Sequence, residues 1–178
     1  KMKKFVIGVI TYFIFIILYF IQANFFGWFT IAGISPNIFV IYILFLGLFT
    51  DNKFSLIMAL LTGITLDLVI GKTLGATAVL FCLISIIANY FDKNFSKDNK
   101  FTILIMVIGM TLVFEVTNYF LNALILEIPI EIEAFSKILL VEVIYNTILT
   151  IIFYNAFIKL GALLERQFKE KNILTRYF

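Results

Sequence analysis

The sequence contains no histidine and a single cysteine, Cys82. These absences exclude a disulfide within the chain and the His/Cys sites that usually hold zinc. Cys82 lies in an apolar run, where a thiol is expected to pack as a small, inert side chain. Charge is scarce too, because only 14% of the 178 residues are Asp, Glu, Lys or Arg. A soluble domain of this length needs more polar surface to cover its core.

Hydrophobic residues, in contrast, make up 62% of the chain and include 22 phenylalanines and eight tyrosines. Aromatic side chains in this number suit positions that face lipid or the membrane–water interface. We therefore predict an all-α integral membrane protein, with residues 1–160 forming one domain of six transmembrane helices. The predicted spans are residues 5–23, 36–50, 54–70, 74–91, 101–126 and 137–159.

Basic residues gather on one side of this topology. Of the 14 Lys and Arg residues, all but Lys72 and Lys137 fall on the side of the N-terminus. Because cytoplasmic loops carry the excess of Lys and Arg, both termini are predicted to be cytoplasmic. The net charge of +3 is small, and because the distribution of basic residues indicates orientation, we expect no nucleic-acid partner. Residues 161–178 mix apolar and basic residues at helical spacing, which predicts an amphipathic tail on the lipid surface.

The connection between the first two predicted spans, residues 24–34, is aromatic and uncharged. We interpret it as a loop at the membrane interface, and a docking surface for a partner stays open as the alternative. Ser35 and Pro36 then predict a helix start, with serine as the N-cap and proline at the first helical position.

A glycine–aspartate element follows at the end of the third predicted span, where Gly63, Asp67 and Gly71 recur four residues apart and Gly75 comes next. This spacing places the first three near one face of a helix. Glycines let a neighbouring backbone approach closely, and the carboxylate must then find a partner away from lipid. The segment 71–73 also predicts the end of one helix, and Gly75 the start of the next.

Two polar stripes lie on the last two predicted spans. Glu115, Asn118 and Asn122 share one helix face, and Glu142 and Asn146 share another. A carboxylate at the centre of a span costs about 2.5–3.5 kcal/mol on insertion scales, so these side chains should face protein or water. The stripes predict either a seam of interhelical hydrogen bonds or a polar cavity that binds a solute or carries protons. The residues alone favour the seam.

The sequence shows no pairing of a nucleophile with a base, no phosphate-binding loop and no metal-ligand cluster. Intramembrane hydrolases would be expected to carry His-Glu-x-x-His, Gly-x-Ser-x-Gly or a matched aspartate pair, and none of these patterns occurs. We therefore predict a protein that is not an enzyme and that needs no cofactor or metal.

Ser35-Pro36-Asn37, the element from Gly63 to Gly75 and the six-span layout resemble the bacterial rod shape-determining protein family MreD. Many members carry an acidic residue after the proline, where this chain has Asn37. The resemblance implies a non-enzymatic subunit of the cell-wall elongation machinery in the bacterial cytoplasmic membrane, which maintains cell shape and organises peptidoglycan synthesis. The implied partner is MreC, a protein with one span and an extracytoplasmic coiled coil. The larger assembly includes RodA, a class B penicillin-binding protein and MreB, and a homo-oligomer is left open.

On this resemblance, one group of residues is expected to shape the surface that engages MreC, and it consists of Pro36, Gly63, Asp67, Gly71 and Gly75. The family fold is similar to the substrate-binding S-components of vitamin ECF transporters, which supplies an alternative function. A small, vitamin-like solute would then bind in a pocket lined by Glu115, Asn118, Glu142 and Asn146. Fold similarity does not transfer function, so such a site needs support of its own.

Overall fold

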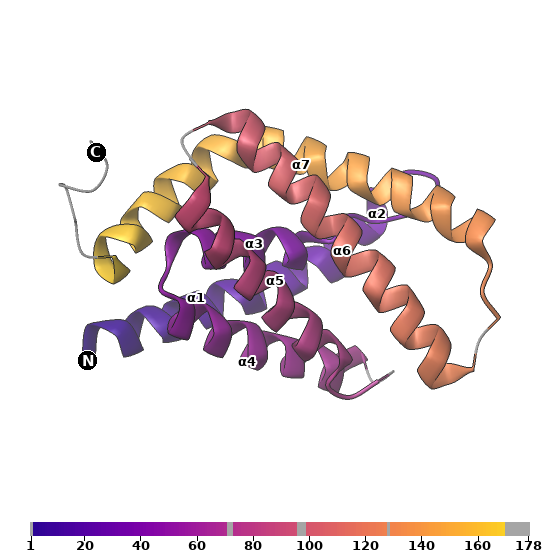
Figure 1. Ribbon diagram of the computed structural model, residues 1–178, viewed down its shortest axis with the longest axis horizontal. Helices are drawn as coiled ribbons and strands as arrows, with labels where there is room; N and C mark the ends of the chain where they lie inside the picture. Colours follow the sequence, from indigo (N-terminus) through magenta and orange to yellow (C-terminus); the bar gives the residue numbers. More distant parts are fainter. Residues whose placement is uncertain (1, 71–72, 96–98, 128, 170–178) are drawn as a thin grey trace.

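The computed structural model describes residues 2–70, 73–95, 99–127 and 129–169. Over these residues the chain is helical, and its one piece of strand-like pairing is an isolated bridge between Ile31 and Ile34. Figure 1 shows the arrangement of the helices. They are α1 (Met2–Phe20), η1, a π-helical turn (Ile21–Phe25), α2 (Phe26–Trp28), α3 (Ile38–Phe49), α4 (Asn52–Ile70), α5 (Ala76–Asn94), α6 (Lys100–Leu126) and α7 (Ile132–Phe168). The all-α prediction is confirmed.

Five helical segments are long and apolar enough to cross a membrane. The first runs without interruption through α1, η1 and α2, and the others are α4, α5, α6 and α7. α3 has only 12 residues, which at 1.5 Å per residue extend over about 18 Å. The hydrocarbon core of a bilayer is about 30 Å thick. The protein is therefore a multi-pass membrane protein in which α3 is too short to cross by itself.

α3 forms the core of the bundle. All of its residues are buried, and it contacts α1, α4, α5, α6 and α7, which surround it in Figure 1. Val40, Leu44 and Leu48 have no exposed surface at all. A helix that is apolar on every side belongs in an interior. The surrounding helices carry the exposed large apolar residues that suit contact with lipid.

The helix start at Ser35 and Pro36 was predicted wrongly. α3 begins at Ile38, and its N-cap residue Asn37 makes no capping bond with its side chain. The side chain of Gln22 in η1 binds the helix start instead. Its Oε1 accepts from the Ile38 N–H at 3.3 Å, and its Nε2 donates to the Pro36 carbonyl at 2.6 Å. The first N–H of the helix is thus satisfied by a side chain distant in sequence, which local spacing cannot reveal.

The predicted aromatic loop is also shorter than expected. Helical structure extends through η1 and α2 as far as Trp28, so the irregular segment covers residues 29–37. Phe26 is buried against the ring of Tyr145, whose hydroxyl donates to the Phe29 carbonyl at 2.5 Å. Trp28 points outward and is 89% exposed. α2 and the start of the irregular segment are therefore anchored on α7, while Trp28 is exposed.

The last helix continues beyond the predicted boundary at residue 160. α7 passes through Gly161 without a break and ends at Phe168. Gly161 packs against the ring of Phe49, where an added Cβ would lie 2.6 Å from Cδ2. Residues 161–168 of the predicted tail therefore extend the same helix, and residues 170–178 lie outside the described part of the chain.

One end of the bundle, which we call the termini end, holds the start of α1 and the last turns of α7 (Figure 1). Lys4 forms an ion pair with Asp51 at 2.6 Å. The rings of Phe54 and Phe168 lie 4.3 Å apart between centroids, and the Lys4 ammonium lies 5.0 Å from the centre of the Phe168 ring. These contacts bind α1, α4 and α7 together.

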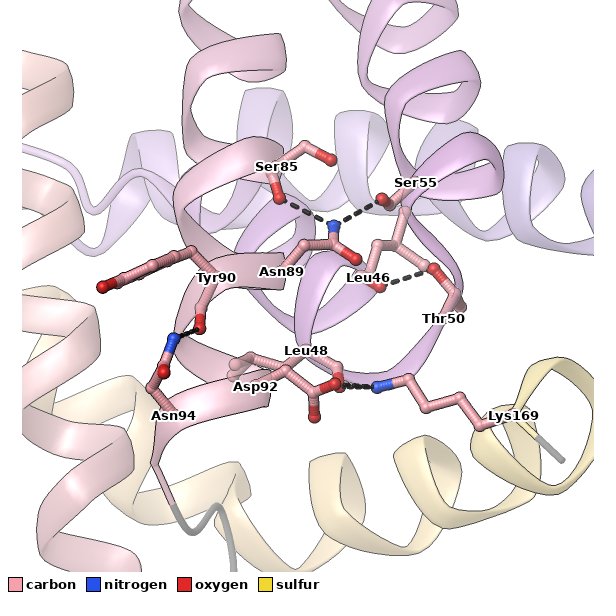
Figure 2. A network of polar contacts seen from close by, with 10 residues as sticks. All are labelled: Leu46, Leu48, Thr50, Ser55, Ser85, Asn89, Tyr90, Asp92, Asn94 and Lys169. Atoms are coloured by element: carbon pink, nitrogen blue, oxygen red, sulfur yellow. Dashed lines mark hydrogen bonds and ion pairs between the residues drawn. The ribbon is translucent and has the colours of Figure 1, made fainter. Parts of the chain in front are cut away.

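A polar network seen in Figure 2 adds α3 and α5 to the same end. Lys169 Nζ donates to the Asp92 carboxylate and, at 2.7 Å, to the Leu48 carbonyl at the end of α3. Deeper in the bundle, Asn89 donates to Ser55 Oγ and to the Ser85 carbonyl, each at 2.8 Å. The termini end is thus held by contacts among five helices.

Candidate functional site

The glycine–aspartate element fixes α4 against α5. A Cβ added at Gly63 would lie 2.3 Å from the Cα and 2.7 Å from the N of Ala78, so the two backbones approach as closely as glycine allows. Gly75 is the N-cap residue of α5, and its φ of 90° lies in the left-handed region that favours glycine. The predicted close approach and helix start are confirmed at these two positions. Gly71 lies outside the described residues.

Asp67 completes this junction. Its carboxylate is 4% exposed and accepts from the N–H groups of Gly75 at 2.8 Å, Thr77 at 3.2 Å and Ala78 at 3.3 Å. These donors belong to the start of α5, which has no carbonyls of its own to offer them. The positive end of the helix dipole stabilises the same charge. The carboxylate therefore has its partner inside the protein, as the sequence predicted.

A cavity of about 1000 Å³ lies at the other end of the bundle, which we call the cavity end. The cavity exists because α3 begins in the middle of the bundle and not at this end. Asn37, the residue before α3, contacts Glu115 and Asn146 in the middle of α6 and α7. At 1.5 Å per residue, Glu115 lies about 16 Å from the end of α6 at Leu126. Over that distance the irregular segment before α3 lines the space, together with residues of α4, α5, α6 and α7.

The irregular segment turns back tightly before it reaches α3. Ile31 and Ile34 exchange two backbone hydrogen bonds of 2.9 Å, and the two residues between them, Ala32 and Gly33, have φ values of 53° and 78°. Both values are typical of the tight turns that glycine and a few other residues accept. Non-helical backbone is tolerated inside a membrane protein where it lines a cavity, because lipid cannot satisfy its polar groups.

The two predicted polar stripes meet at the floor of the cavity, and Asn37 joins them. Its Nδ2 donates to Glu115 Oε1 at 3.1 Å and its backbone N–H donates to Asn146 Oδ1 at 2.8 Å. The carboxyl groups of Glu115 and Glu142 are within hydrogen-bonding range of each other. Asn146, fully buried, also donates to Thr111 Oγ1 at 3.1 Å. Among the described residues two buried side-chain oxygens have no hydrogen-bond partner, Oδ1 of Asn37 here and Oγ of Ser85 nearer the termini end.

Between the floor and the end of α6, the cavity wall formed by α6 is polar. Asn122 Nδ2 donates to Asn118 Oδ1 at 2.8 Å, and Thr73 Oγ1 lies 3.5 Å from Asn122 Oδ1. Tyr119 accepts from the Glu131 N–H at 2.7 Å and thereby ties the segment before α7 to α6. Apolar side chains cover the rest of the wall, among them Phe39, Phe81, Phe114, Phe135 and Ile138.

The structure thus brings most of the predicted site residues to one place. Residues of both predicted groups line the cavity, namely Pro36, Asp67, Glu115, Asn118, Asn122 and Glu142. Asn146 lies below the floor, and Gly63 lies in the α4–α5 contact. Asn146 joins α7 to α6 through Thr111, and stripe residues also line the cavity, so the two alternatives that the sequence left open do not exclude each other. The sequence did not predict that Gln22 binds the start of α3 or that Asn37 joins the two stripes. For Asn37 the only signal was its position beside the predicted helix start, and for Gln22 there was none.

Within the described ranges, no three His, Cys, Asp or Glu side chains gather closely enough to hold a metal ion. The arrangement instead offers carboxyl groups and amides over aromatic walls, which is the make-up of a site that binds by charge and hydrogen bonds.

The fold and the site define a multi-pass, all-helical membrane protein with a polar cavity at one end. Residues 2–163 match the family model of the rod shape-determining protein MreD, so the chain belongs to the MreD family. It is therefore a bacterial membrane protein of rod-shape determination and part of the rod shape complex; the family is structural and is not known for catalysis. Neither the search of curated proteins nor that of solved structures gave a significant match.

Proposed function

We propose that the protein is a non-enzymatic subunit of the cell-wall elongation complex that binds MreC and so helps to organise peptidoglycan synthesis. The observation that carries this proposal is the family match over residues 2–163. RodA, a class B penicillin-binding protein and MreB are the further partners that we expect in the assembly.

The termini end faces the cytoplasm in this proposal. Its basic side chains include Lys4, Lys53, Lys93, Arg166 and Lys169. The cavity end carries Glu127, Glu131 and Glu133. This distribution supports the orientation because Lys and Arg concentrate in cytoplasmic loops. The cavity end would then face the compartment in which the coiled coil of MreC lies.

The surface offered to MreC would be the rim of the cavity, built from the start of α5 and the segment that leads into α7. A partner surface must be held in one shape, because loose groups lose entropy when they are ordered on binding. Asp67 and Gly63 supply that rigidity, since one fixes the start of α5 and the other its distance from α4. This supports the expected partner element at Gly63, Asp67 and Gly75.

The experiment is affinity purification of the tagged full chain from native membranes in a mild detergent, followed by mass spectrometry. We expect an MreC-like protein with one span to be retained, and an unrelated tagged multi-pass protein at equal abundance to retain none. Recovery of the folded chain without such a partner would contradict the proposal.

A second candidate function is binding of a small solute, and the cavity favours it. Pockets for small ligands usually enclose about 300–1000 Å³ and combine apolar walls with a few convergent polar groups. The cavity has about 1000 Å³ and both kinds of lining. Mass spectrometry of small molecules that copurify with the chain tests this candidate, and a ligand-free preparation that takes up no solute counts against it.

A further inference from the structure

The charged groups around the cavity are all of one sign. Four carboxyl groups line it, those of Asp67, Glu115, Glu131 and Glu142, and within the described part of the chain no Lys or Arg does. Asp67 is already balanced by three N–H groups at the start of α5. Glu131 is exposed at the rim. The pair of Glu115 and Glu142 at the floor is the one that lacks a counter-charge among the described lining residues.

This pair lies in a place where charge is costly. Glu142 is 7% exposed, and the floor lies deep between α6 and α7. Two carboxyl groups in contact away from bulk water can be ionised together only if a cation joins them, because desolvation and mutual repulsion otherwise oppose it. Asn37 donates one hydrogen bond to Glu115 but brings no charge.

The floor also has acceptors to spare, the carboxyl oxygens of Glu115 and Glu142. Among them, Glu115 Oε1 accepts one hydrogen bond, from Asn37 Nδ2. An ammonium group has three N–H donors and a guanidinium has five, so either could donate to both carboxylates at once.

The rest of the lining suits an apolar body attached to the cation. Phe135 and Ile138 of α7 line the cavity nearer its mouth, and Phe39, Phe81 and Phe114 line it at the level of the floor. Aromatic faces bind alkyl and aryl groups, and they also attract a cation placed over the ring. A volume of about 1000 Å³ admits a molecule far larger than a metal ion.

We propose that the cavity binds a small organic cation, a primary amine or a guanidine on an apolar skeleton. The cationic group donates to the carboxylates of Glu115 and Glu142, and the skeleton packs along the apolar wall of the cavity. This assignment names the ligand class for the second candidate function and rests on it; it does not depend on MreC binding.

Isothermal titration of the full chain in lipid nanodiscs tests the assignment, with empty nanodiscs to subtract binding to lipid. The probes are phenethylamine and butylguanidine, and their uncharged counterparts are 2-phenylethanol and butylurea. We expect saturable binding of both cations at one site, with the counterparts at least about tenfold weaker, since a hydrogen bond to a charged group is worth about that factor. Equal affinity of cations and counterparts, or no saturable binding of either cation, overturns the proposal.

Variants then locate the site. The double variant Glu115→Gln/Glu142→Gln is expected to lose the preference for cations. Glu133→Gln should keep it, because Glu133 pairs with Lys137 on the exposed start of α7 and does not line the cavity. Cation preference that survives in the double variant overturns the assignment to this pair. The comparison of cations with their uncharged counterparts on the wild-type chain decides the ligand class even if the double variant does not fold. Recovery of MreC from membranes is a separate measurement, so the proposed function and this assignment can fail independently.

Discussion

The two ends of the bundle use polar residues in opposite ways. At the termini end, Lys169 meets Asp92 and Asn89 meets Ser55, so charges and amides find partners on neighbouring helices. At the cavity end, Glu115 and Glu142 lie near each other, and no Lys or Arg among the described lining residues balances them. Each end also holds one buried atom without a partner among the described residues, Ser85 Oγ at the termini end and Asn37 Oδ1 at the cavity end. The difference therefore lies in charge, because Lys169 balances Asp92 while the two glutamates face a cavity that a ligand can enter.

The length of α3 explains the difference. Its last turn reaches the termini end, where Lys169 caps the Leu48 carbonyl. Its first turn stops halfway along α6 and α7, at the level of Glu115 and Asn146. The same helix therefore fills the bundle toward the termini end, and the cavity lies beyond its first turn. Substitutions at the two ends should therefore have different consequences.

Gly63→Leu is expected to have the largest effect. Its Cβ alone would lie 2.3 Å from the Ala78 backbone, which cannot move without separating α4 from α5. We expect a loss of at least about 3 kcal/mol, or failure to accumulate. The matched control is Gly109→Leu, because no atom lies within 4 Å of a Cβ at Gly109. Thermal unfolding in nanodiscs measures both, and equal stability of the two variants would show that the close contact does not matter.

Asp67→Ala is expected to cause the second-largest loss of stability. It leaves three N–H groups at the start of α5 without their acceptor, and an unsatisfied buried donor costs about 1–3 kcal/mol. Asp67→Asn keeps one acceptor oxygen and should lose less. We also expect weaker retention of MreC in the alanine variant. If Asp67→Ala measurably loosens α5 but still retains all of the MreC, the glycine–aspartate element does not contribute to partner binding.

Asn37→Asp sharpens the comparison between the ends. It exchanges the donor to Glu115 for a third carboxyl group, so we expect a loss of roughly 1–2 kcal/mol that phenethylamine reduces. Asn89→Asp is the counterpart at the termini end, where the donor to Ser55 and to the Ser85 carbonyl is lost. Phenethylamine should not rescue that variant. If phenethylamine restored the stability of both variants equally, or of neither, the two ends would not differ in the way proposed.

Glu133→Ala is expected to have the smallest effect. Its ion pair with Lys137 joins side chains that are 86% and 73% exposed on one helix turn. Such pairs contribute less than about 0.5 kcal/mol. A change in unfolding temperature as large as that of Asp67→Ala would mean that the segment leading into α7 carries more of the structure than its contacts indicate.

Local spacing in the sequence predicted much of this structure. Gly63 and Asp67 fall on one face of α4 because they are one turn apart, and that face meets α5. The stripes of Glu115 and Glu142 turn inward for the same reason. Each of these inferences needed only the period of a helix and the cost of a carboxylate in lipid.

What the sequence could not predict depends on contacts between distant residues. Apolar residues continue from 38 to 49 without a sign that the helix is short, and the side chain that starts it, Gln22, lies on another element. A seam and a cavity produce the same pattern of polar residues, because in both cases the stripe faces inward. Only the depth at which α3 begins distinguishes them.

The most direct test of the account is the labelling of single cysteines in intact cells with a maleimide that cannot cross the membrane. In a Cys82→Ser background, Asn118→Cys lies on the cavity wall, Glu133→Cys on the exposed start of α7, and Asn89→Cys is buried toward the termini end. We expect the first two to be labelled from outside and the third to stay unlabelled. Labelling of Glu133→Cys without Asn118→Cys would contradict an open cavity, and labelling of neither until the membrane is broken would contradict the orientation.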